Sequence, residues 1–512
     1  MNELNRNFQM ENVKNALVIM TDQHRVDTIG ALGNPNARTP NLDKLANDGF
    51  AATSAYTPTA ICTPARASLM TGKNPFKHRV LANHEWNIGY QADLTPDQWT
   101  YTQELRDNGY NVGIVGKYHA GENYLPDSFG MDDDSMIGAI NPILNDRYQQ
   151  WLKDNNLPGV RIEDEWKGTL PGGKPGHTIA ARLKQPLEAT FERFLTELAI
   201  ERLREYAADY KESGKPFSLD VHYFGPHLPY IIPDEYFDLI DPEIVELPPS
   251  FSENFANKPP IQANYATYWS TSSFSNEQWR KLIAIYWGYV AMIDHEIGLI
   301  LDELQKLGLA DETAIFFTAD HGEFTGAHRM NDKGPAMYED IYNVPFFAHI
   351  PGIDRSGQTV EFVSILDIPA TIMDLAGLDA KKVEDGRSLL DLVALERGED
   401  LEPWREDIVL EFHGHHFPLQ QRALRTRDYK LVFSPESRSE LYDLKRDPYE
   451  LTNVYDTPVY QNVRRRLETE LYRRLVDRGD TVFAKWMGAM ADIDVNLGST
   501  ANSDYDVALD RA

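Results

Sequence analysis

The chain has 512 residues, of which 42% are hydrophobic and 11% aromatic. This length and apolar content allow a large buried core in roughly two to four domains and exclude a wholly disordered chain. The formal net charge is −29 at pH 7, without a long basic run, so we expect no nucleic-acid partner. The single cysteine, Cys62, excludes an intramolecular disulfide and a zinc site built from several cysteines.

The N-terminal segment contains one short apolar run, Ala16–Met20, which Thr21 and Asp22 follow at once. A signal peptide needs an apolar stretch of about 7–15 residues, and a membrane helix needs about 18 or more. We therefore expect a cytoplasmic protein with no membrane partner. A chain whose leader has been removed, and which is periplasmic or secreted, is the alternative.

Short apolar runs alternate with helical patterns over the first 400 residues. The runs predicted to be buried strands are 16–20, 112–115, 217–221, 314–318 and 344–349. A helix is predicted to begin at Pro40 and to stop at Gly49. A longer helix is predicted to begin at a capping box of Ser275 and Gln278 and to end at Gly308. This alternation predicts an α/β fold with a mostly parallel sheet flanked by helices.

The pattern changes near residue 400. Segments 422–433 and 440–444 are predicted to be two strands around a polar turn, and regularly spaced apolar residues predict a helix over 463–475. We therefore predict a small C-terminal α+β subdomain with an antiparallel sheet. The predicted divisions are a large α/β domain over 1–400, the subdomain over 401–483, and a tail or oligomerisation arm over 484–512.

Cys62 begins the segment CTPARASLMTG, in which Pro64 suits the first turn of a helix and Gly72 its end. This places Cys62 at a helix N-terminus, where unpaired N–H groups favour an anion. Arg66 lies one turn later on the same face. A nucleophile beside a guanidinium suits a phosphate or sulfate group. A buried free cysteine without a catalytic role is the alternative that this spacing leaves open.

The motif C-x-P-x-R at 62–66 resembles the signature of the type I sulfatases, which belong to the alkaline phosphatase superfamily. Further segments resemble that family in the same order: 15–23 with 39–49, 116–119, 226–229, 318–322, 333 with 338–339, and 429–448. Tyr118 departs from the pattern, which has Trp. The resemblance spans about residues 15–455 and implies an alkaline-phosphatase-like sheet with a catalytic domain over 1–400.

In that family a maturation enzyme oxidises the motif cysteine to Cα-formylglycine. The resemblance therefore implies that Cys62 is the nucleophile precursor and that a formylglycine-generating enzyme is a partner. It also implies one divalent metal ion with the following ligands: Asp22, Gln23, Asp320, His321 and the modified Cys62. We expect Ca²⁺, with Mg²⁺ or Mn²⁺ as alternatives, because oxygen ligands suit hard cations and an imidazole also suits transition ions.

The implied reaction is hydrolysis of a sulfuric ester, with a small-molecule or saccharide sulfate as substrate. The residues expected to act on it are Cys62, Arg66, Lys117, His119, His227, Asp320 and Lys333. The three cations among them would share the negative charge of the sulfate. Asp320 and His119 would each accept a proton from a hydroxyl of the formylglycine hydrate, and either His227 or Lys333 would protonate the leaving alcohol.

Hydrolysis of a phosphonate monoester or phosphodiester is the alternative within the same superfamily. Gln23 and His321 replace the commoner Asp and Asn, and both variants resemble the phosphonate monoester hydrolase branch and several sulfatases. Those hydrolases tend to carry Tyr and Thr where Lys117 and His119 stand, so the two residues favour sulfate. A non-catalytic metal-binding relative is a third class, against which the retained residues argue.

Substrate contacts are harder to predict, because loops contact the alcohol part of the sulfuric ester. The candidates are His84, His328, Arg329, His413 and His415. An ordinary surface loop remains the alternative for the histidines at 413 and 415. A homo-oligomer formed through the C-terminal arm is also expected as an option.

Overall fold

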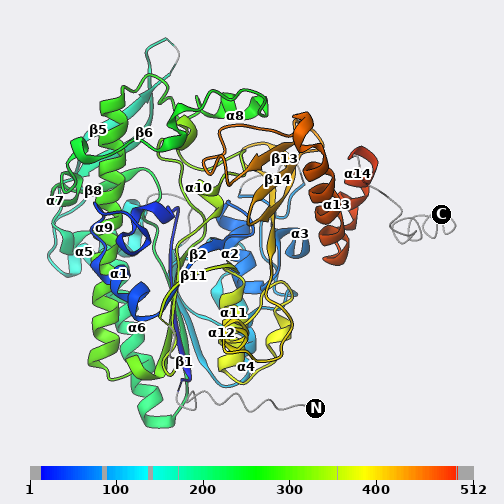
Figure 1. Cartoon of the computed structure of the whole chain (residues 1–512). Helices are drawn as coiled ribbons and strands as arrows, with labels where there is room; N and C mark the ends of the chain where they lie inside the picture. The colour runs from blue at the N-terminus through cyan, green and yellow to red at the C-terminus, as the bar shows by residue number, and fades with distance from the viewer. Residues whose placement is uncertain are drawn as a thin grey trace.

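The computed structural model describes residues 13–83, 89–136, 142–170, 172–353, 356–491 and 493 (Figure 1). Its largest sheet has eight strands in the order β11-β2-β10-β9-β1-β7-β3-β4. The strands are β1 (Asn15–Thr21), β2 (Phe50–Tyr56), β3 (Asn111–Lys117), β4 (Asp132–Met136), β7 (Phe217–His222), β9 (Thr313–Ala319), β10 (Phe346–His349) and β11 (Gly357–Ser364). All neighbours pair in parallel except β10, which is antiparallel to both β9 and β2. The predicted α/β fold with a mostly parallel sheet is confirmed.

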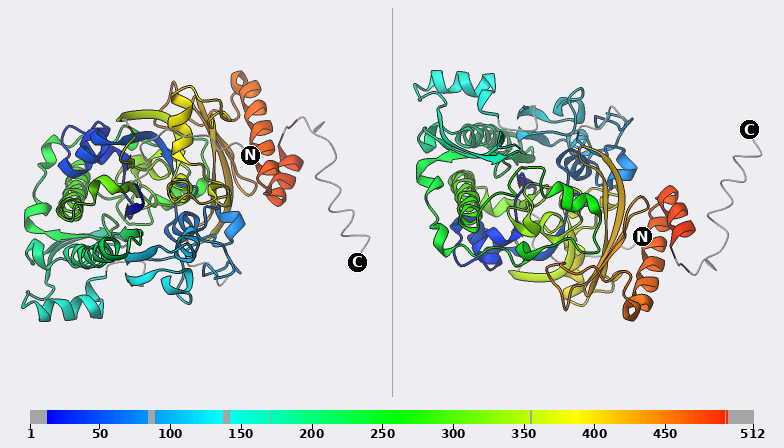
Figure 2. Two further views of the ribbon diagram at one scale, coloured as in Figure 1. Left: turned by 90° about the horizontal axis from the view of Figure 1, so that it is seen from below. Right: turned by 90° about the horizontal axis from the view of Figure 1, so that it is seen from above.

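Helices cover both faces of this sheet. One face carries α1 (Pro40–Asp48), α6 (Phe191–Ser213) and α9 (Asn276–Lys306); the other carries α2 (Cys62–Thr71), α4 (Tyr101–Asp107), α11 (Asp367–Leu375) and α12 (Leu389–Glu396). Figure 2 shows the green and teal α9 and α6 across the sheet from the yellow α11 and α12. Successive side chains of β1 point to opposite faces of the sheet. Leu17 packs in the apolar core on one face, and Val18 packs in the core on the other. The predicted capping box of Ser275 and Gln278 opens α9.

The C-terminal part forms a second, antiparallel sheet in the order β12-β13-β14-β15. Its elements are β12 (Asp407–Gly414), β13 (Pro418–Thr426), β14 (Tyr429–Phe433), β15 (Glu440–Asp443), α13 (Gln461–Asp477) and α14 (Thr481–Met490). The single strand predicted over 422–433 is wrong, because β13 and β14 are separated there by Arg427 and Asp428. A two-residue connection without glycine or proline leaves little trace in a sequence. The helix predicted over 463–475 is confirmed as part of α13.

The start of the predicted tail is a packed helix. Residues 484–490 lie in α14, where Phe483, Ala484 and Met487 are buried with α13 in one apolar cluster. Residues 494–512 lie outside the described residues.

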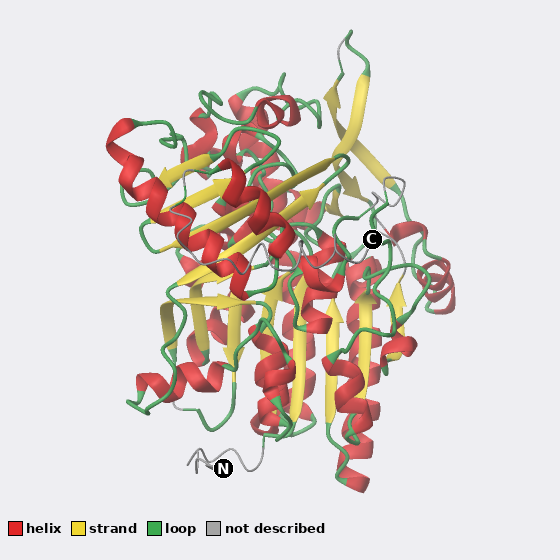
Figure 3. Cartoon of the chain, turned by 90° about the vertical axis from the view of Figure 1, so that its right-hand side faces the viewer, coloured by secondary structure: helices red, strands yellow, loops and turns green. Residues whose placement is uncertain are grey.

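The remaining elements surround the end of the large sheet. A three-stranded sheet has the order β5-β6-β8, with β5 (Ile162–Thr169), β6 (Pro175–Leu183) and β8 (Tyr230–Pro233). The shorter α-helices are α3 (Pro75–His78), α5 (Asp146–Asp154), α7 (Asp234–Phe237), α8 (Pro260–Tyr265) and α10 (Glu339–Tyr342). Figure 3 shows central strands of the large sheet pointing toward the small antiparallel sheet. Within the described ranges, no helix has the length and apolar character needed to cross a membrane.

Candidate active site

The site forms where β1 and β9 end. These strands pair in parallel with Thr21 opposite Ala319, so the next residue of each strand, Asp22 and Asp320, emerge side by side. Ligand sites in open α/β sheets form at such carboxyl ends. The backbone N–H of Gln23 donates to Asp320 Oδ1 at 3.1 Å and ties the two loops together. Gln23 has a φ of 64°, an unusual backbone conformation for a residue with a side chain.

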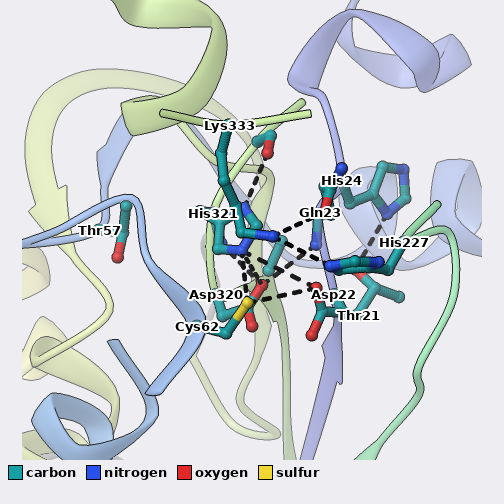
Figure 4. Close-up of polar contacts among 12 residues, drawn as sticks. Thr21, Asp22, Gln23, His24, Thr57, Cys62, His227, Asp320, His321 and Lys333 are labelled. Atoms are coloured by element: carbon teal, nitrogen blue, oxygen red, sulfur yellow. Dashed lines mark hydrogen bonds and ion pairs between the residues drawn. The ribbon is translucent and has the colours of Figure 1, made fainter. Parts of the chain in front are cut away.

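Cys62 faces these loops from the start of α2 (Figure 4). Its Sγ lies 3.1 Å from His321 Nε2 and 3.9 Å from Asp22 Oδ1. We call Asp22, Cys62, Asp320 and His321 the site cluster. Their ligand atoms all lie within 4.8 Å of one another, and all four side chains are buried. Two carboxylates, an imidazole and the Cys62 position therefore fit one divalent cation.

Two cations lie against the carboxylates of the cluster. Arg66 is 1% exposed; its Nη2 lies 3.0 Å from Asp22 Oδ2 and 2.9 Å from Asp320 Oδ2. The guanidinium also donates to the backbone oxygen of Lys117 at 2.7 Å, which fixes its plane. Lys117, the last residue of β3, brings its Nζ to 2.5 Å from Asp22 Oδ2. Positive charge is thus concentrated beside Cys62 in a water-poor pocket.

A third cation enters from the loop after β9. Lys333 Nζ donates to Gln23 Oε1 at 3.1 Å and to Asp332 Oδ1 at 3.2 Å, and it lies 3.0 Å from His227 Nε2. The Lys333–His227 contact makes His227 Nε2 the acceptor when the lysine is charged. Both residues predicted to protonate the leaving alcohol therefore meet at one point, as Figure 4 shows.

His119 lies close to the start of α2. Its Nε2 lies 3.2 Å from the hydroxyl of Thr63, the residue after Cys62. His119 has a φ of 44°, and its buried Nδ1 has no hydrogen-bond partner among the described residues. Burial and nearby Lys117 lower the pKa of His119 to about 4, so its neutral form can accept a proton.

The electrostatics of the cluster favour an ionised position 62. Burial would raise the pKa of the Cys62 thiol, but Lys333, Lys117 and His321 hold it well below its ordinary value. Burial alone would lower the pKa of His321, yet Asp320 and Cys62 raise it to about 9. Perturbed groups gathered in one buried place are typical of functional sites.

The sulfatase family matches residues 14–378, which is more than half of the chain. The chain belongs to the sulfatase family. The C-terminal region of N-sulphoglucosamine sulphohydrolase also matches residues 326–477. As a family member the chain is an enzyme, a sulfuric ester hydrolase.

The similar proteins described next align with most of this chain. An ulvan-active sulfatase of Formosa agariphila is 28% identical over 91% of this chain and 82% of its own length. An arylsulfatase of Clostridium perfringens is 28% identical over 87% of this chain and 91% of its own. The phosphonate monoester hydrolase of Agrobacterium radiobacter has the same fold, with a TM-score of 0.73, 24% identity, and coverage of 91% and 95%.

The structure of this sulfatase brings one of the five predicted substrate contacts next to the site. His415 Nε2 lies 3.7 Å from Asp332 Oδ2, and Asp332 holds Lys333. The side chain is buried, and its Nδ1 has no hydrogen-bond partner within the described part of the chain. Its neighbour His416 stacks on the half-exposed Tyr268, 5.2 Å between ring centroids. His84 lies outside the described residues.

The other three candidates have different surroundings. His328 is fully buried; its Nδ1 lies 2.8 Å from Glu253 Oε2, and its ring stacks 3.7 Å from that of Tyr338. Arg329 places its guanidinium over the Phe251 ring. His413 Nε2 lies 2.8 Å from Glu411 Oε2, and both residues belong to β12 of the small sheet. In this structure buried partners or an aromatic ring hold these three side chains, and their roles as substrate contacts stay predictions.

Sequence reasoning missed Asp332 and Glu323, which are buried beside the site. Asp332 pairs with Lys333, and Glu323 accepts a hydrogen bond from Gln23 Nε2. Each lies within two residues of a predicted site residue. The signal in the sequence was an acidic residue within two positions of a predicted metal ligand or cation.

Proposed function

We propose that this sulfatase cleaves a sulfate monoester with a Cα-formylglycine derived from Cys62 and one divalent ion. The observation that carries the proposal is the convergence of Asp22, Asp320 and His321 on Cys62, with all ligand atoms within 4.8 Å. The hydrated aldehyde would supply a hydroxyl nucleophile, and the ion would polarise the ester oxygens. Gln23 Oε1 would be the remaining ligand, and Ca²⁺ is the proposed ion, with Mg²⁺ or Mn²⁺ as alternatives.

The chain's own cations would hold the sulfate group. Lys117 and Lys333 lower the pKa of the thiol at position 62, which supports an anion at that point. Arg66 is committed to both aspartates, so it would act chiefly by fixing their carboxylates. This is a more indirect role than the sequence predicts for Arg66.

Proton transfers are assigned by proximity. His119, beside Thr63 and neutral, would accept a proton from the group at position 62. The Lys333–His227 pair would deliver a proton to the leaving alcohol, because the two nitrogens are 3.0 Å apart and can share it. Asp320 would accept the proton of the attacking hydroxyl.

An assay with three esters tests the proposal. An aryl sulfate, a phosphonate monoester and a phosphodiester are compared with matured enzyme and with its Cys62→Ala variant, and mass spectrometry of the Cys62 peptide reports maturation. We expect Cys62-dependent turnover that is fastest for the sulfate. Faster phosphonate turnover would favour the second candidate function, hydrolysis of a phosphonate monoester or phosphodiester. Gln23, His321 and the likeness to a phosphonate monoester hydrolase support that candidate.

The partners are also proposed. The substrate is a small-molecule or saccharide sulfate, and a formylglycine-generating enzyme acts on Cys62. A homo-oligomer through the C-terminal arm is supported by Val482, Trp486 and Met490, which lie one turn apart on α14 and are exposed. Light scattering of wild type and Trp486→Glu tests it: a variant with unchanged mass would contradict an arm-mediated oligomer.

A further inference from the structure

Glu323 is a buried carboxyl group for which the function above has no role. It lies two residues after His321 and is fully shielded from solvent. Its Oε1 accepts hydrogen bonds from the backbone N–H groups of Thr325, at 3.0 Å, and of Asp332. Its Oε2 accepts a hydrogen bond from Gln23 Nε2. One carboxyl group thus joins the loop after β1 to two points of the loop after β9.

The contact with Glu323 decides which way the Gln23 amide faces. An amide presents an oxygen on one side and an NH₂ group on the other, and only the oxygen can bind a hard cation. With Nε2 held by Glu323, Oε1 turns to the opposite side, where it accepts from Lys333 Nζ at 3.1 Å. Figure 4 shows Gln23 and Lys333 joined by this contact beside the cluster. An aspartate would present oxygen in either orientation, so the need for a fixed orientation is particular to glutamine.

We propose that Glu323 is a positioning residue that holds the Gln23 amide with its oxygen toward the site cluster. The inference rests on the proposed cation site. Outer partners of this kind typically change metal affinity about 10–100-fold when they are removed. The same carboxyl group also orders the backbone at Asp332, directly before Lys333.

The test compares two variants of the full chain that change the hydrogen-bond donors and acceptors between positions 23 and 323. In Glu323→Gln, the new amide must keep its oxygen on the two backbone N–H groups, so it directs NH₂ at Gln23. Gln23 then flips and turns its own NH₂ toward the cluster. The double variant Glu323→Gln with Gln23→Glu restores every hydrogen bond, because the carboxylate at 23 accepts from the new amide and keeps one oxygen free for the cation.

The readout is the dissociation constant of Ca²⁺ and Mn²⁺, measured by calorimetry on matured protein without substrate. We expect Glu323→Gln to weaken binding at least 10-fold and the double variant to recover to within about 3-fold of wild type. Glu440→Gln is the matched control: Glu440 is equally buried and accepts from Gln262 Nε2 at 3.1 Å, but in the small sheet. It should leave the metal constants unchanged.

The outcomes separate the two proposals. A wild type that binds neither of these ions, nor Mg²⁺ in the same measurement, would overturn the cation site and this inference with it. A wild type that binds, with Glu323→Gln equal to it, would overturn the positioning role alone. Weak binding in Glu323→Gln that the double variant does not recover would also overturn it, since Glu323 would then act through the loop rather than through Gln23.

Discussion

Two of the buried groups of charges among the described residues are built in different ways. The interface cluster, Glu339, Arg425, Lys430 and Glu450, joins α10 and the segment after β15 to strands β13 and β14 of the small sheet. Lys430 in β14 contacts both carboxylates, and Arg425 in the neighbouring strand lies 3.2 Å from Glu339. Here opposite charges alternate, and regular strands hold the two cations.

The site cluster instead gathers two carboxylates, an imidazole and Cys62 at loop ends. Asp22 and Asp320 share one guanidinium, and their mutual repulsion, together with burial, raises the pKa of Asp320. Such an arrangement costs stability and leaves the groups ready to bind other charges. The difference teaches that charges paired on regular strands serve cohesion, whereas carboxylates gathered at loop ends with a reactive centre serve binding.

The largest expected effect is on activity at the site. Lys333→Met removes the proton donor and one cation, so kcat/KM for an aryl sulfate should fall about 10²–10⁴-fold. Buried Asp332 loses its partner as well, so the urea midpoint should fall and kcat/KM is compared per folded molecule. A variant that retains activity would show that His227 alone supplies the proton.

At the interface cluster we expect stability to change and activity to stay. Lys430→Met leaves Glu339 and Glu450 facing each other without their shared cation, which should lower the free energy of unfolding by about 3–5 kcal/mol. Urea denaturation measures the loss, and kcat per folded molecule should stay within about twofold of wild type. A large fall in kcat at unchanged stability would break the comparison.

A buried carboxyl group outside both clusters makes stability depend on pH. Burial raises the pKa of Asp220 to about 7, and Tyr101 donates to it at 2.8 Å. The folded state therefore binds a proton that the unfolded state releases above its ordinary pKa. Stability contributed by this group is lost as pH rises toward 7. Between pH 5 and 7 the wild type should lose about 2 kcal/mol relative to Asp220→Asn, measured by urea denaturation at each pH.

The smallest predicted effects distinguish His415 from His413, two histidines of one short segment. His415→Ala, beside Asp332, should raise KM for the substrate about 3–10-fold, as expected for loss of one hydrogen bond to a bound group. His413→Ala removes a partner of buried Glu411 and should lower the melting temperature by a few degrees instead. Equal KM for the two variants would remove His415 from the substrate site.

Much of the fold was predictable because buried parallel strands read as short apolar runs. All five predicted runs overlap strands of the large sheet. The strand β2 was not predicted, since FAATSAY is rich in small and polar residues and has no continuous apolar run. The antiparallel direction of β10 was not predictable either, because strand direction depends on pairing and not on local sequence.

The site was predictable as far as its motifs are local. Asp22, Cys62, Arg66, Asp320 and His321 are brought together as the resemblance implies. The sequence does not predict the partner of each group. In the structure Arg66 bridges two aspartates, His328 pairs with buried Glu253, and Glu323 accepts a hydrogen bond from Gln23. These contacts depend on loops that meet only after the sheet has formed.

The parallel pairing of β1 with β9 has a consequence for how the enzyme comes into being. The backbone of Gln23 bonds to Asp320 across 297 positions of the chain. No fragment shorter than that can contain both halves of the cation site, and a slip of one residue between the strands would turn one aspartate to the opposite face. Closing this long loop is a slow step of assembly. The site cluster therefore forms together with the pairing of β1 and β9, and a chain that stops before Asp320 has neither.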